Sequence, residues 1–181
     1  GPNRNQHIEG IALPTYFMAG MTAWGSMMAV LGGGARISQE RSVNWHRQLR
    51  ITPLRTPTYI ATKLLTAYAM AVLTMVVVYA AGMLLGVRLD PARWFEMSGY
   101  VLVGLVPFAV IGFVLGHLLT VDAMGPALGG VTSLFAVLGG AWGPVATRGW
   151  LRDVVELLPS YWIVRAGHTA VGGDAWPAEA W

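Results

Sequence analysis

Four long stretches of this 181-residue sequence contain no Asp, Glu, Lys or Arg. Each is 24 to 26 residues long, and they occupy residues 10–35, 64–87, 97–121 and 123–147. A helix needs about 20 residues, most of them apolar, to cross the hydrocarbon core of a bilayer. The pattern therefore predicts an all-α membrane protein with four transmembrane helices, at about residues 11–34, 63–86, 98–120 and 124–147.

Composition excludes several other classes of protein. Hydrophobic residues make up 55% of the chain and charged residues 12%, whereas soluble domains are about 25% charged. The chain is too hydrophobic to be disordered, and its lack of cysteine excludes a disulfide-stabilised secreted domain. Six of the 12 Lys and Arg residues lie between residues 36 and 63, so the positive charge belongs to the loop at residues 36–62. We therefore expect no nucleic-acid partner.

The same loop sets the expected orientation and carries its own helix signal. Lys and Arg close to span ends favour the cytoplasmic side, so we expect this loop to be cytoplasmic. Ser38 fits the N-cap of a helix, and Trp45 and Leu49 share one helical face. The Thr52-Pro53 pair would end that helix. These residues predict a short amphipathic helix lying flat on the membrane surface, and they leave open an ordinary positively charged connector.

Other signals divide the rest of the chain. Pro107 predicts a kink in the third span. A tight turn before the fourth span is predicted from Asp122, Gly125 and Pro126. Residues 150–168 mix apolar and charged side chains on both sides of Pro159, and the segment is too short to cross the membrane. We expect two short helices that dip into the membrane from its external side, within an external segment at residues 148–170.

Small residues recur at helical spacing on three of the predicted spans. They are Gly25, Ala29 and Gly33 on the first, Gly112 and Gly116 on the third, and Gly125 and Gly129 on the fourth. Such stripes allow two helix backbones to approach closely in lipid, so they predict helix-packing faces. Glycine and alanine are also common in membrane helices generally, and this alternative stays open for each stripe.

The order of residues in the cytoplasmic loop resembles the signature of type-2 ABC transporter permeases. In that family Glu-Arg, a glycine, a leucine, Thr-Pro and a lysine follow one another, and the stretch forms the coupling helix that docks on the cytoplasmic ATPase. The resemblance therefore assigns to ATPase coupling the residues Glu40, Arg41, Asn44, Trp45, Leu49, Thr52 and Pro53, with Lys63 opening the next span. Asn44 stands where the family usually has glycine, and asparagine tolerates a positive φ.

The resemblance implies the membrane subunit of an ATP-driven exporter in the bacterial cytoplasmic membrane. Its expected cargo is amphiphilic or hydrophobic, such as a drug, an antibiotic or a lipid-like molecule. Expected partners are a cytoplasmic ABC ATPase subunit, a second permease copy, identical or related, and the lipid bilayer. We expect no cofactor in this chain, because ATP and Mg would bind to the ATPase. Aromatic candidates for the substrate path are Tyr16, Phe17, Trp24, Tyr68 and Trp142, and lipid-facing packing is the alternative for each.

Two further expectations follow from the resemblance. The segment Leu158–Trp162 resembles the family's external re-entrant hairpin, which precedes its last span. The family has six spans with both termini inside, against the four counted here. We therefore expect residues 1–181 to be a single permease domain within a longer protein, without its first and last transmembrane helices.

An enzyme and a non-transporting assembly protein are the alternatives to a transport subunit. An enzyme would be an intramembrane serine hydrolase with Ser26 as nucleophile and His117 as base. Helix packing explains Ser26 better, and a hairpin turn explains Asp122 beside His117 better. The four histidines fall at different ends of the predicted spans, so we expect no metal site. The sequence also lacks a phosphate-binding P-loop, so ATP hydrolysis is expected on another chain.

Overall fold

Helices form nearly all of the computed structural model, which describes residues 7–8, 11–43, 56–143 and 150–172. The elements in chain order are β1 (His7–Ile8), β2 (Ile11–Ala12), α1 (Leu13–Ser42), α3 (Thr56–Leu84), α4 (Pro91–Gly104), α5 (Val106–Leu118), α6 (Val121–Leu138), α7 (Trp150–Glu156) and α8 (Pro159–Ala170). The predicted all-α class is confirmed. The small antiparallel pair of β1 and β2, in which His7 lies opposite Ala12, was not predicted.

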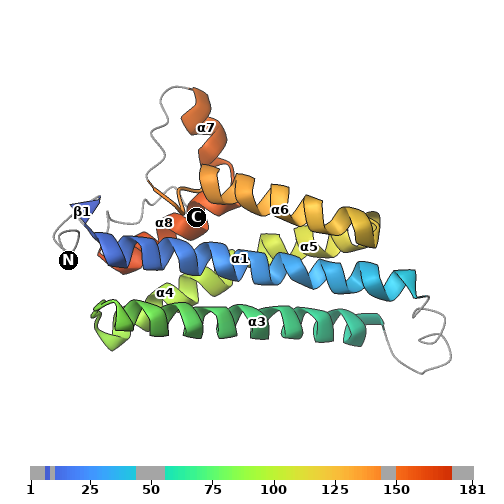
Figure 1. The fold of residues 1–181 in the computed structure, drawn as a ribbon, viewed down its shortest axis with the longest axis horizontal. Helices are drawn as coiled ribbons and strands as arrows, with labels where there is room; N and C mark the ends of the chain where they lie inside the picture. The colour runs from blue at the N-terminus through green and yellow to red at the C-terminus, as the bar shows by residue number, and fades with distance from the viewer. Residues whose placement is uncertain (1–6, 9–10, 44–55, 144–149, 173–181) are drawn as a thin grey trace.

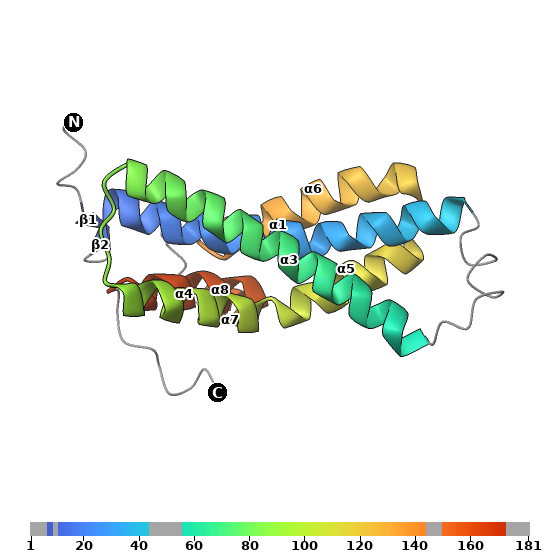
Figure 2. The same ribbon diagram turned by 90° about the horizontal axis from the view of Figure 1, so that it is seen from below.

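Helix α1 is the centre of the bundle. It packs most extensively against α3 and α5, and it also contacts α6 and α8. In Figure 1 it runs lengthwise between α3 and α6, and Figure 2 shows α3 crossing it obliquely. Buried residues occur along its whole length, from Thr15 to Ser38. The core of the molecule therefore lies around α1 rather than on one side of it.

Three of the described helical segments are long and apolar enough to cross a membrane: Pro57–Leu84, Pro91–Leu118 and Val121–Leu138. They correspond to the second, third and fourth predicted spans. Helix α1, which contains the first predicted span, is not among them, although it has 30 residues. Its threonines, glycines and charged last turns lower its mean hydropathy, and neighbouring helices surround it.

The C-terminal end of α1 differs from the prediction. Ser38 does not begin a new helix, because α1 continues unbroken to Ser42. The Ser38 side chain is buried and its hydroxyl group donates a hydrogen bond to the Ala35 carbonyl, 2.9 Å away. A serine within a helix satisfies its hydroxyl group in this way. Charged residues at positions 36, 40 and 41 thus belong to α1 itself.

The third span is interrupted close to the predicted position. Helix α4 ends at Gly104 and α5 begins at Val106, with Leu105 between them. Pro107 lies in the first turn of α5, where its missing N–H group removes no helical hydrogen bond. The break therefore precedes the proline by two residues.

Helix α6, which corresponds to the fourth predicted span, is shorter and begins earlier than predicted. Its N-cap is Thr120, whose side chain accepts a hydrogen bond from the Ala123 N–H group at 3.4 Å. The turn from α5 thus occurs at Leu119 and Thr120, and Pro126 lies inside α6. The helix ends at Leu138, before the predicted end, because Gly140 adopts a φ of 75° and closes a Schellman motif.

Two short helices, α7 and α8, occupy the segment after α6. Pro159 opens α8, and Leu158 precedes it in an extended conformation. Helix α8 packs on α4, α1 and α6, and its buried residues include Ile163, Val164 and His168. The segment therefore contains the two predicted helices, and the second is a component of the core.

Candidate functional site

Glu40, near the end of α1, binds two side chains at the start of α3. The Tyr59 hydroxyl group donates a hydrogen bond to one carboxylate oxygen at 2.7 Å, and the Lys63 ammonium group forms an ion pair with the other. The side chains of Glu40 and Lys63 are only 26% and 20% exposed. At this burial, a charge-assisted pair ties its two helices more firmly than a fully exposed pair would.

Arg41, the next residue, binds the end of α5. Its guanidinium group donates to the carbonyl oxygens of Gly116, at 3.2 Å, and of His117. These two carbonyls lie in the last turn of α5, where a helix has no internal donors for them. A cation at this position also interacts favourably with the helix dipole. Consecutive residues of α1 therefore bind different helices.

Three consecutive glycines position α1 between its neighbours. Each residue turns a helix by about 100°, so Gly32, Gly33 and Gly34 face three directions. A Cβ atom on Gly33 would lie 3.3 Å from the Ala67 Cβ atom on α3, and one on Gly34 would overlap the Gly112 carbonyl oxygen on α5. A Cβ atom on Gly32 would meet no atom within 4 Å. The first of these glycines therefore leaves open space, and the other two allow close packing.

Together these contacts form what we call the loop-end clamp: the side chains of Glu40, Arg41, Tyr59 and Lys63 and the last carbonyls of α5. It joins α1, α3 and α5 at the end of the bundle where α1 leads into residues 44–55 and α3 emerges from them (Figure 1). Of the residues assigned to coupling by resemblance, Glu40 and Arg41 are therefore bonded within the bundle. The others, Asn44, Trp45, Leu49, Thr52 and Pro53, lie outside the described residues.

Most of the predicted packing residues lie between helices. Gly25 and Gly33 face α3, where a Cβ atom on Gly25 would lie 2.9 Å from the Thr74 methyl group, and Ala29 packs against the core on the same stripe. Gly112 and Gly116 face α1. Gly125 and Gly129 differ, because a Cβ atom on either would meet no described atom within 4 Å.

Several close approaches were missed in the sequence. Among them are those at Gly34 and at Gly20, where a Cβ atom would overlap the Ala141 carbonyl oxygen. Gly34 belongs to the run Gly32–Gly34, so the run itself was the available signal. A residue next to the Gly25–Gly33 stripe points 100° away from it, toward another helix.

The aromatic residues proposed for a substrate path lie in different surroundings. Tyr16 is 1% exposed, and its ring stacks on His168 with centroids 4.0 Å apart. Trp24 and Trp142 form an edge-to-face pair at 5.9 Å. Phe17 is 36% exposed and Tyr68 is partly buried against the core. None of the five lines either of the two cavities described below.

The hydrolase alternative has no geometric support. Ser26 is fully buried, and its hydroxyl group has no hydrogen-bond partner among the described residues. His117 lies at the end of α5, with Nδ1 2.8 Å from the Phe113 carbonyl oxygen. Gly34 of α1 packs against Gly116, the neighbour of His117 in α5. Ser26 lies eight residues before Gly34, which places it about 12 Å further along α1 from the level of His117. No three potential metal ligands cluster in the described parts of the chain.

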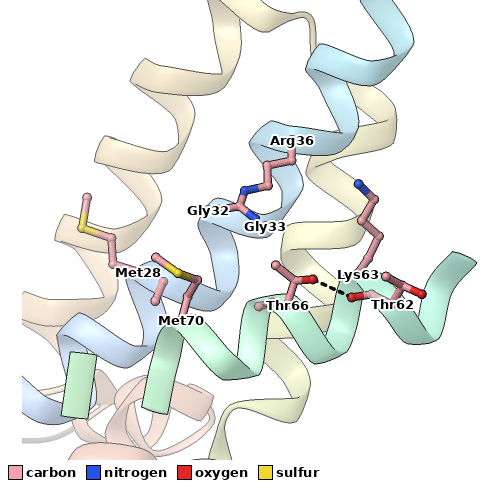
Figure 3. A pocket seen from close by; sticks show the side chains of 10 residues that line it. Met28, Gly32, Gly33, Arg36, Thr62, Lys63, Thr66 and Met70 are labelled. Atoms are coloured by element: carbon pink, nitrogen blue, oxygen red, sulfur yellow. Dashed lines mark hydrogen bonds between the residues drawn. The ribbon is translucent and has the colours of Figure 1, made fainter. Parts of the chain in front are cut away.

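A pocket of about 250 Å³ lies between α1 and α3 beside the loop-end clamp (Figure 3). Arg36 and Lys63 are its charged residues, and Thr62 and Thr66 contribute hydroxyl groups. The remaining lining is apolar or glycine and consists of Met28, Ala29, Gly32, Gly33, Ala67 and Met70. We call it the α1–α3 pocket.

A larger cavity of about 690 Å³ lies between α4 and α8. It is lined mainly by apolar residues, among them Val103, Trp162 and Ile163. The Glu96 carboxylate also lines it and accepts a hydrogen bond from the Tyr100 hydroxyl group at 3.1 Å.

We predict that His168 makes the stability of the fold depend on pH. Burial lowers the pKa of His168 to about 4, while its Nε2 atom lies 3.2 Å from the Tyr16 carbonyl oxygen. The unfolded chain takes up this proton near pH 6.5. The stabilisation that buried, neutral His168 contributes is therefore fully present above pH 6.5. It decreases as the pH falls toward 4, by about 2 kcal/mol at pH 5. Unfolding in detergent across this range should show the slope in the native chain and lose it in His168→Gln; an equal slope in both would contradict the prediction.

Comparison with known proteins agrees with this architecture. The family described as ABC-2 family transporter protein matches residues 2–181. The chain is also 26% identical over 153 residues to a Bacillus subtilis (strain 168) protein named "Putative transport permease YvfS". That alignment covers 83% of this chain and 62% of the relative, so the chain spans less than two thirds of the relative's length. No solved structure matches it significantly. The resemblance found in the loop is thus confirmed, and the chain belongs to the ABC-2 family of transporter proteins.

Proposed function

We propose that this chain is the membrane-spanning subunit of an ATP-driven exporter for an amphiphilic or hydrophobic substrate. ATP and Mg bind to a separate cytoplasmic ABC ATPase, and a second permease copy completes the transport unit. Family membership supports a transport permease rather than an enzyme. Our proposal adds three features to family membership: the export direction, the class of substrate and the partner subunits.

The loop-end clamp is the observation that carries the proposal. Residues 44–55 connect α1 to α3, and Glu40 ties these two helices together next to that connection. Arg41 adds α5 to the same unit. A force that an ATPase applies to residues 44–55 therefore moves three helix ends together instead of bending one of them. Rigid-body movement of this kind is a common way of switching a transport path.

The proposed membrane arrangement uses α1 as a fourth span. Its 30 residues correspond to a length of about 45 Å, and it lies beside α3. The loop end faces the cytoplasm, because half of the Lys and Arg residues lie between residues 36 and 63. We assign the coupling role to residues 44–55, which follow the clamp residues of α1 in the chain. Helices α7 and α8 form the external re-entrant hairpin.

The charges of the spans favour an apolar or amphiphilic cargo. In the three candidate spans, Lys63, Arg93, Glu96 and Asp122 are all within seven residues of a helix start. A path for ions or protons usually leaves ionisable groups in the middle of the membrane. The 690 Å³ cavity between α4 and α8 has the size and the apolar lining of a site for a small organic molecule.

The proposal predicts that Trp45→Asp and Leu49→Asp uncouple ATP hydrolysis from transport. Both side chains belong to the apolar face expected to dock on the ATPase, and a carboxylate there opposes burial. We expect cargo-stimulated ATPase activity in reconstituted vesicles to fall at least about tenfold, which corresponds to roughly 1.4 kcal/mol of lost interaction. Leu157→Asp, which changes an 83% exposed leucine between α7 and α8, is the matched control.

Co-purification separates the proposal from its alternatives. A transport subunit retains a cytoplasmic ATPase in mild detergent, and the two aspartate variants release it without changing the unfolding temperature of the permease. If the native permease retains no ATPase, the assembly-protein alternative is favoured. Normal cargo-stimulated activity in both variants would contradict the coupling role.

A further inference from the structure

The α1–α3 pocket contains a positive charge that no described group neutralises. Arg36 makes no hydrogen bond or ion pair within the described part of the chain. In Figure 3 its guanidinium group folds back along α1 toward Gly32 and Gly33, into the pocket. Lys63 lines the same pocket while it pairs with Glu40. The pocket therefore retains a net positive charge, which suits a singly charged anion.

The hydroxyl groups of both threonines in the pocket already donate hydrogen bonds to the backbone of α3. Thr62 donates to the Thr58 carbonyl oxygen at 2.8 Å. Thr66 donates to the Thr62 carbonyl oxygen, also at 2.8 Å (Figure 3). Their oxygen atoms can still accept hydrogen bonds. An anion in the pocket would thus take its donors from Arg36 and Lys63, and hydroxyl groups attached to that anion could donate to the threonines.

Polarity in the pocket changes in one direction along both helices. Met28 lies eight residues before Arg36, and Met70 lies seven residues after Lys63, so each methionine is about 10 to 12 Å closer to the middle of the bundle. The methionines are 43% and 41% exposed, so they face outward from the bundle. Cations at the loop end and flexible apolar side chains toward the middle match the order of phosphate and acyl chain in one leaflet.

The depth of the cations fits the same leaflet. Arg36 is six residues before the end of α1 and Lys63 is seven residues after the start of α3, which places both about 10 Å inside the helix ends. A helix of about 45 Å is longer than the hydrocarbon core of about 30 Å by roughly 8 Å at each end, so both residues lie near the level of the lipid phosphates. Gly32 supplies the space, because a side chain at that position would enter the pocket.

We propose that the α1–α3 pocket binds one anionic phospholipid of the leaflet at the loop end. The lipid phosphate lies between Arg36 and Lys63, and one acyl chain follows Met28 and Met70. Binding requires only that the chain lies in a bilayer, so it can be tested independently of transport, cargo and ATPase.

Native mass spectrometry of the purified chain can test this site. Phosphatidylglycerol and phosphatidylcholine with identical acyl chains would be titrated separately, and single-lipid adducts counted. We expect phosphatidylglycerol to bind about tenfold more tightly, and Arg36→Gln to remove most of that preference. Gly32→Leu, which fills the pocket, should abolish binding of the single tight lipid. The control Arg88→Gln removes an exposed arginine at the opposite end of the bundle and should leave the preference unchanged.

Three results would overturn the proposal. They are equal affinity for the two lipids, an unchanged preference in Arg36→Gln, and an equal loss in Arg36→Gln and Arg88→Gln, which would indicate attraction by overall charge. Glycerol phosphate distinguishes a lipid site from a simple anion site. Its failure to displace the lipid at millimolar concentration is expected, and displacement would show that the phosphate alone is recognised. Unfolding temperatures no lower than that of the native chain would confirm that Gly32→Leu and Arg36→Gln are folded.

Discussion

Replacement of Gly34 by leucine should lower the free energy of unfolding by about 4 kcal/mol or prevent folding of the bundle. A Cβ atom at this position overlaps the Gly112 carbonyl oxygen and lies 2.8 Å from the end of the Met124 side chain. The methionine can move, but the carbonyl belongs to the backbone of α5. Helices α1 and α5 would have to separate, and Arg41 would then lose its contact with the end of α5.

The neighbouring glycine provides the matched control. Gly32→Leu introduces the same side chain two residues earlier in the same helix, where a Cβ atom meets nothing within 4 Å. It also removes a glycine from a helix interior, which adds about 1 kcal/mol of helix propensity. Thermal unfolding in detergent should therefore show a large decrease for Gly34→Leu and none for Gly32→Leu. Similar stability of the two variants would contradict the backbone contact between α1 and α5.

Reversal of one charge in the loop-end clamp should destabilise the bundle by about 3 kcal/mol. Glu40→Lys removes the partner of Lys63 and places a second positive charge beside it, and Lys63→Glu creates the corresponding negative pair. The double variant, with both charges exchanged, restores the ion pair. The Tyr59 hydroxyl group can then accept a hydrogen bond in place of donating one.

A double-mutant cycle on the unfolding free energy measures this interaction. We expect the double variant to be more stable than either single variant, with an interaction energy of at least about 1 kcal/mol. Tyr59→Phe serves as a milder comparison and should cost about 1 kcal/mol, because it removes one hydrogen bond to a charged group. Additive effects of the two charge reversals would show that Glu40 and Lys63 do not depend on each other.

Hydropathy predicted the apolar helices well and their ends poorly. The charge-free stretches correspond to α3, to α4 with α5, and to α6, but α3 begins seven residues before the predicted start at residue 63. Local hydrogen bonding determines such ends. The Thr120 cap and the positive φ of Gly140 fix the ends of α6, and neither depends on where apolar residues stop. An interior Ser38 was misread as a cap for the same reason.

The partners of the site residues could not be predicted from the sequence. Spacing of three or four residues reveals neighbours on one helix, which is how the Gly25–Gly33 stripe was identified. Glu40 and Lys63 are 23 residues apart, and Arg41 and His117 are 76 apart, so only the packing of helices brings each pair together. The resemblance drew attention to Glu40 and Arg41, but it assigned them to a docking helix rather than to contacts with α3 and α5.

The attachment of Arg41 to α5 has a mechanical consequence for α6. Only Leu119 and Thr120 separate these two helices, so the end of α5 cannot be displaced without carrying the start of α6 with it. A force applied at Val43 is therefore transmitted through the Arg41 guanidinium group to His117, more than 70 residues further along the chain, and so to the hairpin of α5 and α6. Movement of the last turn of α1 is thereby coupled to movement of the whole α5–α6 hairpin.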